Sequence, residues 1–262
     1  MKKVLLLLAA VLLLYSCSML QNINTERVMT GGSKVVQALG VTNDQMKSYV
    51  TASVAQLDAA ATVLPASNAY SKRLARITSG LTKVDDTPLN FKVYKQDEVN
   101  AFACADGSVR VYTGLMDIMS DNEILGVIGH EVGHVAMEHT MNAYKYALYT
   151  SAAFDVIAST GNLAAALTDS VLGQLGQSMI EARYSRKQET EADDFGYSFL
   201  KAAGVNPWYM ASAFEQLQKA SGDGSAAVQS SVAEMFSSHP NTASRIERVA
   251  AKCAADGFAK PE

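Results

Sequence analysis

Two histidines four residues apart flank a glutamate in the segment His130-Glu131-Val132-Gly133-His134. On a helix, residues i and i+4 lie one turn apart on the same face, so both imidazoles can bind a single metal ion. Glu131 follows the first histidine, where its carboxylate can face a water molecule beside the metal. This His-Glu-x-x-His pattern is typical of zinc peptidases, so it predicts His130 and His134 as zinc ligands and Glu131 as the catalytic base.

A catalytic zinc ion needs three protein ligands and one open position. His139 is one option for the third ligand. The arrangement with a third histidine in the same segment requires a glycine at position 137 and a histidine at position 140. The chain has Met137 and Thr140 there, so we expect His139 to be a structural or supporting residue.

The other option for the third ligand lies downstream, where Glu189 and Asp193 are four residues apart on a predicted helix and share a face. We expect Glu189 to bind zinc and Asp193 to accept the free ring N–H of a ligand histidine, which fixes the orientation of the imidazole. Glu191 competes for the ligand role. No acid follows it four residues later, where the chain has Phe195, so Glu189 is preferred.

The element that must position the histidines is a helix with a clear start. Ser120 and Glu123 form a Ser-x-x-Glu capping box directly before the apolar pair Ile124-Leu125. The helix is expected to run from there to His139, because no proline interrupts it.

The remaining pattern predicts an α+β fold of zincin type that is mainly helical, with a small antiparallel sheet beside the zinc-binding helix. Apolar and polar residues alternate within residues 90–113, and Asp106-Gly107 signals a hairpin turn. Helical spacing, caps and stop signals predict the other elements, namely helices over about 43–64, 70–81, 179–203 (ended by Gly204), one begun by Asn206-Pro207, one from Thr242 past Cys253, and a helical hairpin within about 147–174.

The beginning of the chain resembles an export signal. Lys2 and Lys3 precede an apolar run over residues 4–14 that is too short to span a bilayer. The run ends in Leu14-Tyr15-Ser16-Cys17, which resembles a bacterial lipobox. This predicts a signal peptide over 1–16, lipidation of Cys17, a polar tether over 17–40 and a single metallopeptidase domain over 41–262. Ser18 after the cysteine resembles the sorting pattern of outer-membrane lipoproteins, which implies a catalytic domain facing the periplasm.

Composition restricts the function further. The chain has 22 basic and 26 acidic residues, a net charge of −4 and 48% hydrophobic residues. Without a dense basic patch, we expect no nucleic-acid partner. Besides Cys17, the cysteines are Cys104 and Cys253. An exported compartment permits a disulfide between them, but both could equally be small buried hydrophobic residues.

Several further motifs occur with the zinc motif in a characteristic order, and together they resemble the metallopeptidase family 48 gluzincins over roughly residues 65–250. The residues that carry the resemblance are Asn100-Ala101-Phe102-Ala103, Val109-Arg110-Val111-Tyr112-Thr113-Gly114-Leu115, His130-Glu131-Val132-Gly133-His134, Tyr184-Ser185-Arg186, Glu189-x-x-Ala192-Asp193, His239-Pro240 and Arg245.

The resemblance implies roles for residues outside the zinc motif. Val109 and Val111 are expected on an edge strand near the zinc helix, where an extended peptide substrate can pair. His239 is expected close to the site, and in some relatives the equivalent histidine takes the fourth zinc position and closes the enzyme. Its alternative role is to shape the turn before the last helix. Arg245 is expected to pair with an acid or with the bound peptide.

These observations predict a zinc-dependent endopeptidase of the bacterial cell envelope with one Zn²⁺ per chain. Its partners would be polypeptide substrates, in particular unfolded or misassembled envelope proteins, and a membrane through the lipid anchor. Two alternatives remain open. One is a chaperone-like lipoprotein that binds outer-membrane proteins and carries a regulatory zinc site, and the other is a purely structural lipoprotein.

Overall fold

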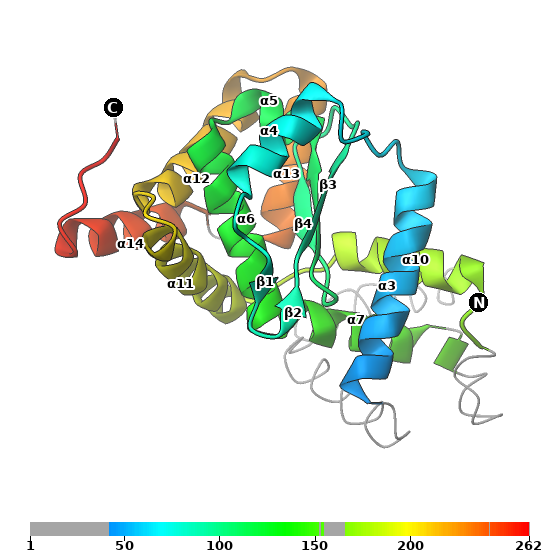
Figure 1. The fold of residues 1–262 in the computed structure, drawn as a ribbon. Coiled ribbons are helices and arrows are strands. Elements are labelled where there is room, and N and C mark those ends of the chain that lie inside the picture. The colour runs from blue at the N-terminus through cyan, green and yellow to red at the C-terminus, as the bar shows by residue number, and fades with distance from the viewer. Residues whose placement is uncertain (1–41, 152, 155–165, 241, 262) are drawn as a thin grey trace, which may run out of the picture.

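A mixed sheet lies between two groups of helices (Figure 1). The computed structural model describes residues 42–151, 153–154, 166–240 and 242–261. The predicted signal peptide, the tether and the lipidation site Cys17 lie outside these ranges, as does most of the middle of the predicted hairpin over 147–174. The elements are α3 (Asn43–Ala60), α4 (Ala69–Ile77), β1 (Lys83–Val84), β2 (Thr87–Pro88), β3 (Asn90–Tyr94), β4 (Ala101–Ala103), β5 (Ser108–Tyr112), α5 (Thr113–Ile118), α6 (Asp121–Ala136), α7 (His139–Thr150), α10 (Asp169–Ile180), α11 (Arg186–Ala202), α12 (Trp208–Asp223), α13 (Ala226–Ser238) and α14 (Thr242–Ala255).

The predicted fold class, mainly helical with a small sheet beside the zinc-binding helix, is confirmed. The sheet itself is mixed rather than wholly antiparallel. The hairpin predicted at Asp106-Gly107 joins β4 and β5, which pair antiparallel, whereas β3 pairs parallel to β5 on its other side. Gly107 has a φ of 85°, and a side chain there would meet the carbonyl oxygen of Pro88. The parallel pair was not predictable from alternation alone, because a parallel and an antiparallel partner leave the same period of two.

The position of Val109 and Val111 differs from the expectation. The strand order is β3-β5-β4, so β5 is the central strand and has no free edge. Both valines are fully buried in the core against α6. The expectation that they lie on a substrate-pairing edge strand is therefore wrong. The edge strand on the α6 side of the site is β4, which carries Ala101–Ala103.

The side chains of the sheet alternate between two cores. Val93, Val109 and Val111 face the core formed with α6, α11 and α12. Tyr94 and Tyr112, one residue further along their strands, face the core formed with α3, α7 and α10. Successive residues of a strand point to opposite faces. Both faces of the central strand β5 are buried, so its polar residues Ser108 and Arg110 are buried as well, although they alternate with apolar residues in the sequence.

The metal-motif helix α6 packs closely on α11 through glycines. A Cβ atom on Gly133 would lie 2.8 Å from the carbonyl oxygen of Ala192, and one on Gly129 would lie 2.7 Å from the ring of Phe199. On the opposing helix, a Cβ atom on Gly196 would lie 3.1 Å from the backbone nitrogen of His130. These glycines allow the two helices that carry the predicted ligands to approach each other.

Two predicted helices have different bounds in the structure. The helix expected over 179–203 is two helices, because α10 ends at Ile180 and α11 begins after Ser185, whose side chain caps the new helix at Gln188. The helix expected to reach His139 ends at Ala136. Glu138 there adopts a left-handed conformation with φ 56°, which a sequence pattern does not reveal for a residue other than glycine.

A partly buried ion-pair network fixes α3 to the sheet. Asp58 on α3 accepts hydrogen bonds from Arg110 Nε at 2.8 Å, Lys92 Nζ at 2.7 Å and the Tyr94 hydroxyl at 2.6 Å. Burial acts to raise the pKa of Asp58, but these partners outweigh it and lower the pKa from 3.8 to about 2. Because the Arg110 side chain is only 2% exposed, this charge depends on Asp58.

The disulfide considered between Cys104 and Cys253 is not formed. Both cysteines are free and fully buried. Cys104 lies in the core with α3 and α7, and Cys253 lies in the core with α12. They serve as small hydrophobic residues, the other use expected for them.

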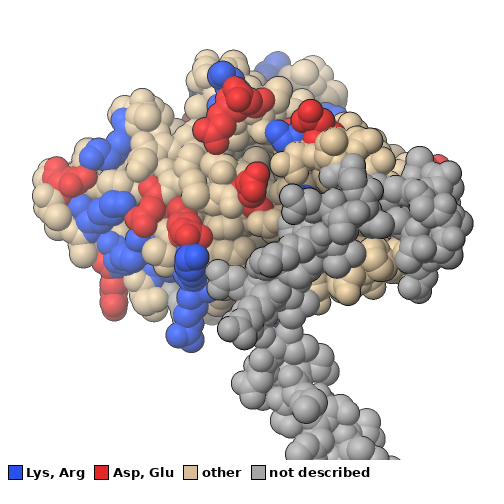
Figure 2. All heavy atoms as spheres, turned by 90° about the horizontal axis from the view of Figure 1, so that it is seen from below, with Lys and Arg blue, Asp and Glu red and all other residues tan. Residues whose placement is uncertain are grey.

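On the face shown in Figure 2, basic and acidic side chains of the described residues alternate rather than separate into large patches of one sign. Among the described residues, none of the helices combines the length and hydrophobicity needed to cross a membrane.

Candidate metal centre

The helix α6 brings two imidazoles to one face near its C-terminal end. The predicted capping box is present, since the Ser120 side chain accepts a hydrogen bond from the backbone N–H of Glu123 and the Glu123 carboxylate accepts one from the backbone N–H of Ser120. One turn apart on α6, His130 Nε2 and His134 Nε2 lie 3.1 Å from each other. Both rings are almost completely buried, at 3% and 0% exposure.

The helix α11 supplies a carboxylate to the same point. Ser185 caps α11 and places Glu189 in its first turn, where the positive end of the helix dipole favours a negative charge. Glu189 Oε1 lies 3.4 Å from His134 Nε2, and Glu189 Oε2 lies 3.6 Å from His130 Nε2.

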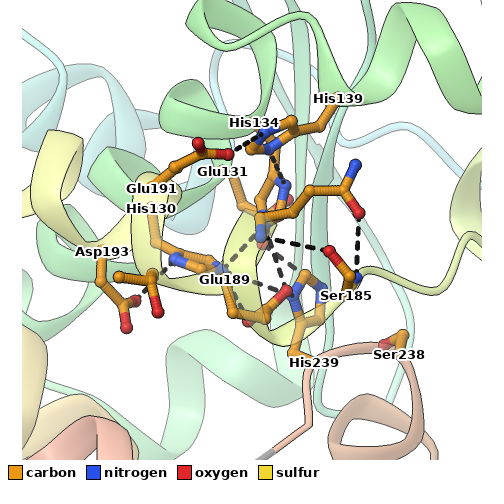
Figure 3. A network of polar contacts seen from close by, with 12 residues as sticks. His130, Glu131, His134, His139, Ser185, Glu189, Glu191, Asp193, Ser238 and His239 are labelled. Atoms are coloured by element: carbon orange, nitrogen blue, oxygen red, sulfur yellow. Dashed lines mark hydrogen bonds and ion pairs between the residues drawn. The ribbon is translucent and has the colours of Figure 1, made fainter. Parts of the chain in front are cut away.

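A third imidazole arrives from the end of α13. His239 Nδ1 lies 3.0 Å from Glu189 Oε1 and 3.3 Å from His130 Nε2. Within the described residues, one donor atom from each of His130, His134, Glu189 and His239 falls within 4.8 Å of all the others. Figure 3 shows these four side chains pointing toward one another.

This donor set fits a tetrahedral zinc ion. Nitrogen and oxygen donors about 2.1 Å from one tetrahedral zinc ion lie roughly 3.4 Å apart. The distances between neighbouring donors here are 3.0 to 3.6 Å. Three imidazoles and a carboxylate are ligands that zinc prefers. Without a cation, the buried carboxylate would lie among ring nitrogens that, like it, offer electron pairs to a metal.

Asp193 and Arg245 contact the donor residues on the side away from the proposed metal position. Asp193 Oδ1 lies 3.0 Å from His130 Nδ1, the ring nitrogen opposite the metal face. Arg245 on α14 contacts Asp193 Oδ1 at 2.7 Å and Glu189 Oε2 at 2.5 Å. The guanidinium also stacks over the ring of Phe214, with 4.3 Å between its central carbon and the ring centre. Of the two roles considered for Arg245, pairing with an acid is the one that the structure shows.

His134 is oriented by two further side chains. His139 Nδ1 lies 3.0 Å from His134 Nδ1, and His139 Nε2 lies 3.2 Å from Glu191 Oε2. His139 and Glu191 therefore support a ligand and are not part of the donor cluster. The ring of Tyr184 stacks on His134 with 3.9 Å between the ring centres.

Burial and neighbouring charges set the protonation states of the cluster. Burial lowers the pKa of His134 well below its usual value, which keeps this imidazole neutral and able to bind a metal. Burial alone would raise the pKa of Glu189, but the positive potential of His239 and the hydrogen bond from His134 outweigh it and hold the pKa well below normal. For Asp193, burial is likewise outweighed by His130 and Arg245, so its pKa is also low.

Glu131 differs from the other acids of the site. Burial raises its pKa, although His239, His130 and a hydrogen bond from the Ala103 backbone act in the opposite direction. Its Oε1 atom is buried without a hydrogen-bond partner in the described residues. His239 Nε2 lies 3.8 Å from this Oε1 atom. A buried carboxylate with one oxygen unused and a raised pKa is suited to take up and return a proton.

A His-Glu-x-x-His helix joined by a glutamate from a second helix defines the gluzincin class of metallopeptidases, and this chain has that arrangement. The chain belongs to peptidase family M48, whose family model matches residues 65–252. It is a metalloendopeptidase.

Characterised relatives match over different shares of the chain. It is 39% identical to the metalloprotease YcaL of Escherichia coli (strain K12), over 95% of this chain and 97% of the relative. It is 37% identical to the metalloprotease LoiP of the same organism, over 91% and 92%. The beta-barrel assembly-enhancing protease of Escherichia coli (strain K12) is 32% identical over 50% of this chain and 28% of its own length.

Sequence reasoning did not find two contacts of the site. The Ala103 backbone donates to Glu131, and a backbone donor leaves no mark in a sequence. Tyr184 was noted only as part of a family motif, and its stacking on His134 depends on the chain turning between α10 and α11. The Ser-x-x-Gln capping box from Ser185 to Gln188 marks the start of α11, so it could have predicted that the chain turns before this helix.

Proposed function

We propose that this chain is a zinc-dependent endopeptidase of the bacterial cell envelope that hydrolyses unfolded or misassembled envelope proteins. The observation that carries the zinc peptidase assignment is the convergence of His130, His134, Glu189 and His239 beside Glu131. Export and lipidation are supported by the lipobox-like sequence that ends at Cys17. The envelope substrate is supported by the name of one relative, a beta-barrel assembly-enhancing protease.

In this proposal, His130, His134 and Glu189 hold the zinc ion. A bound zinc ion supplies Lewis acidity, which polarises the scissile carbonyl and lowers the pKa of the nucleophilic water. Glu131 takes the proton from that water at its free Oε1 atom and returns it to the departing amine. Asp193 fixes the ring of His130, and Arg245 neutralises the second oxygen of Glu189.

The substrate pairs with the edge strand β4. Among the described residues, this strand pairs only with β5, on one of its two sides, and Ala103 at its end contacts Glu131. An extended peptide added to β4 satisfies its backbone groups and places an amide next to Glu131. This role replaces the one that the sequence assigned to Val109 and Val111.

The structure corresponds to a closed state of the site in this proposal. His239 takes the position of a fourth donor. A substrate needs to reach this same position. The residues around Glu131 and His239 leave a cavity of only about 10 Å³. Opening therefore requires the end of α13 to move His239 away from Glu189.

Substitution of Glu131 by Gln tests the catalytic assignment. We expect the variant to bind one zinc ion per chain and to lose about 10²–10⁴-fold in kcat on unfolded casein, because the proton acceptor is gone. Zinc is measured by elemental analysis and cleavage by fluorescence of labelled casein. Cleavage at the wild-type rate would remove Glu131 from this role. If the wild-type protein prevents aggregation of unfolded outer-membrane proteins without cutting them, the chaperone-like alternative is correct instead.

Substitution of His239 by Ala tests the closed state. We expect zinc to remain bound by the other three ligands and casein cleavage to rise several-fold. A fall in cleavage with zinc retained would show that His239 promotes the reaction rather than blocking it.

Anchoring is tested separately in cells. We expect the full chain to incorporate radiolabelled fatty acid and to fractionate with the outer membrane, and the Cys17→Ser variant to do neither. Wild-type labelling at the level of this variant would contradict the lipid anchor without affecting the peptidase assignment.

A further inference from the structure

A cavity of about 590 Å³ lies near the metal centre, and neither the catalytic residues nor the metal ligands line it. Its walls come from the loop before β4, the end of β5, the C-terminal end of α10 and the α13 helix. The lining includes Glu98, Asn100, Tyr112, Glu181, Arg183 and Glu234.

The cavity is connected to the proposed substrate path at two points. Asn100 in its wall directly precedes β4, the strand whose other end, Ala103, contacts Glu131. Three residues of extended strand correspond to about 10 Å. Elsewhere in the lining, the Ser238 carbonyl accepts a hydrogen bond from the Tyr184 backbone at 3.1 Å, and Ser238 immediately precedes His239.

The walls carry an excess of negative charge. Three glutamates and one arginine line the cavity. Glu98 and Glu234 are exposed, and neither carboxylate makes an ion pair with the described residues. Glu181 accepts a hydrogen bond from Gln177, also in the wall, at 2.9 Å. A cation in the cavity would therefore meet carboxylates from three different segments.

Tyr112 places an unused polar group in the same cavity. Its side chain is only 6% exposed, and its hydroxyl has no hydrogen-bond partner among the described residues. Burial, followed by the charges of Glu98 and Glu234, raises the pKa of Tyr112 to about 12. The hydroxyl group is thus close to those two wall carboxylates and stays protonated, so its oxygen can accept a hydrogen bond from a cationic ligand.

We propose that this cavity is a substrate subsite that binds the side chain of a lysine or arginine. The inference rests on the proposed peptidase function and specifies its substrate class. If the peptide pairs antiparallel to β4, it runs from Ala103 toward Asn100, so the basic residue lies within about three positions on the C-terminal side of the scissile bond. The ammonium or guanidinium group meets Glu98 and Glu234, and the Tyr112 hydroxyl accepts one of its hydrogen bonds.

Matched peptides test the subsite in the zinc-loaded enzyme. Fluorogenic peptides are identical except for Lys, Gln or Glu at each of the first four positions after the scissile bond. At one of these positions we expect kcat/KM to be about fivefold higher for Lys than for Gln and lower again for Glu. The preference should weaken as salt is raised from 0.05 to about 0.5 M, because exposed charges are screened.

Charge removal in the cavity identifies the residues responsible. The double variant Glu98→Gln with Glu234→Gln should bring the ratio of kcat/KM for the Lys and Gln peptides close to one. The control double variant Glu215→Gln with Glu247→Gln changes the net charge equally outside the cavity and should keep the wild-type ratio. Thermal unfolding of both variants checks that they are folded. Tyr112→Phe should lower the same ratio, with the aromatic packing retained.

The outcomes separate the two proposals. If none of the peptides is cleaved, the peptidase function itself fails. If the peptides are cleaved but the Lys/Gln ratio stays near one at all four positions, or if the control double variant lowers the ratio as much as the cavity variant, the subsite is overturned and the peptidase function stands.

Discussion

Arg245 forms ion pairs with two buried acids, Asp193 and Glu189, and is itself only 5% exposed. A buried charge that loses its partner costs several kcal/mol. The three residues therefore depend on one another, and each acid also contacts a ligand histidine, Asp193 at His130 and Glu189 at His134. The orientation of the ligands at this site is therefore set by neighbouring side chains that contact the ligands, namely Asp193 and Arg245.

Replacing Asp193 by Asn should weaken zinc binding by about 10–100-fold, because the amide no longer pairs with Arg245 or orients the His130 ring as strongly. Competition with a chromophoric chelator measures the affinity. Asp194→Asn is the matched control, since Asp194 is adjacent, half exposed and contacts Arg248 and Lys252 instead. Equal losses in both variants would contradict a specific role for Asp193.

At the scale of elements, the close packing of α6 on α11 determines whether the ligands meet. Gly133 lies between His130 and His134 in the chain and faces the backbone of Ala192 on α11. Glu189 is one turn before Ala192. A larger residue at 133 must push the two helices apart and so separate the histidines from Glu189.

We expect Gly133→Ala to reduce zinc affinity by at least about tenfold and to destabilise the fold by about 1–3 kcal/mol through overpacking. Isothermal titration and urea unfolding measure the two effects. The control is Gly173→Ala on α10, where a Cβ atom meets only Gln56 at 3.9 Å and helix propensity should increase stability. Unchanged zinc affinity in Gly133→Ala would show that α11 can move without affecting the site.

The anchoring of α3 to the sheet by Asp58 gives a prediction with a defined pH dependence. Asp58→Asn leaves the buried Arg110 without its charged partner and should cost about 2–4 kcal/mol at pH 7. The folded pKa of about 2 lies below the unfolded value of 3.8. The stabilisation is therefore full above pH 3.8 and is lost as the pH falls through about 2. Urea unfolding of both proteins at several pH values should show the difference shrinking over this window; a constant difference would contradict it.

Several elements of the site were predictable because their signals are local. The capping box at Ser120, the four-residue spacing of His130 and His134, and the spacing of Glu189 and Asp193 depend on neighbours within one or two turns. The strand order was not predictable, because β3, β4 and β5 are short and the alternation of their residues does not reveal which strands pair. The family expectation for Val109 and Val111 failed for this reason, since a central and an edge strand can carry the same residues.

The helix boundaries show the same division between local and distant causes. The stop at Gly204, with φ 71°, followed from its residue type. The break between Ala136 and His139 depends on Glu138 in a left-handed conformation, which places His139 back against His134. The intrinsic preference of glutamate does not predict that conformation. The α13 helix was missed, although Ser225 caps it.

For the whole molecule, metal binding should add to stability, because the unfolded chain does not hold the ligands together. At a zinc concentration about 100-fold above the dissociation constant, the gain is about 2.7 kcal/mol. This corresponds to a rise in melting temperature of about 5–10 °C for a chain of this size. Scanning calorimetry with zinc and with a chelator measures it. His134→Ala should melt at the same temperature in both solutions; a zinc-dependent shift in that variant would place the ion elsewhere.

The donors of the cluster are contributed by α6, α11 and the residue after α13, so more than one hundred positions separate His130 from His239. A ribosome that has released only the chain up to residue 188 holds the two histidines of α6 without their carboxylate. Such a nascent polypeptide lacks the third ligand. The complete donor set can therefore assemble only after α11 has been synthesised and has packed on α6.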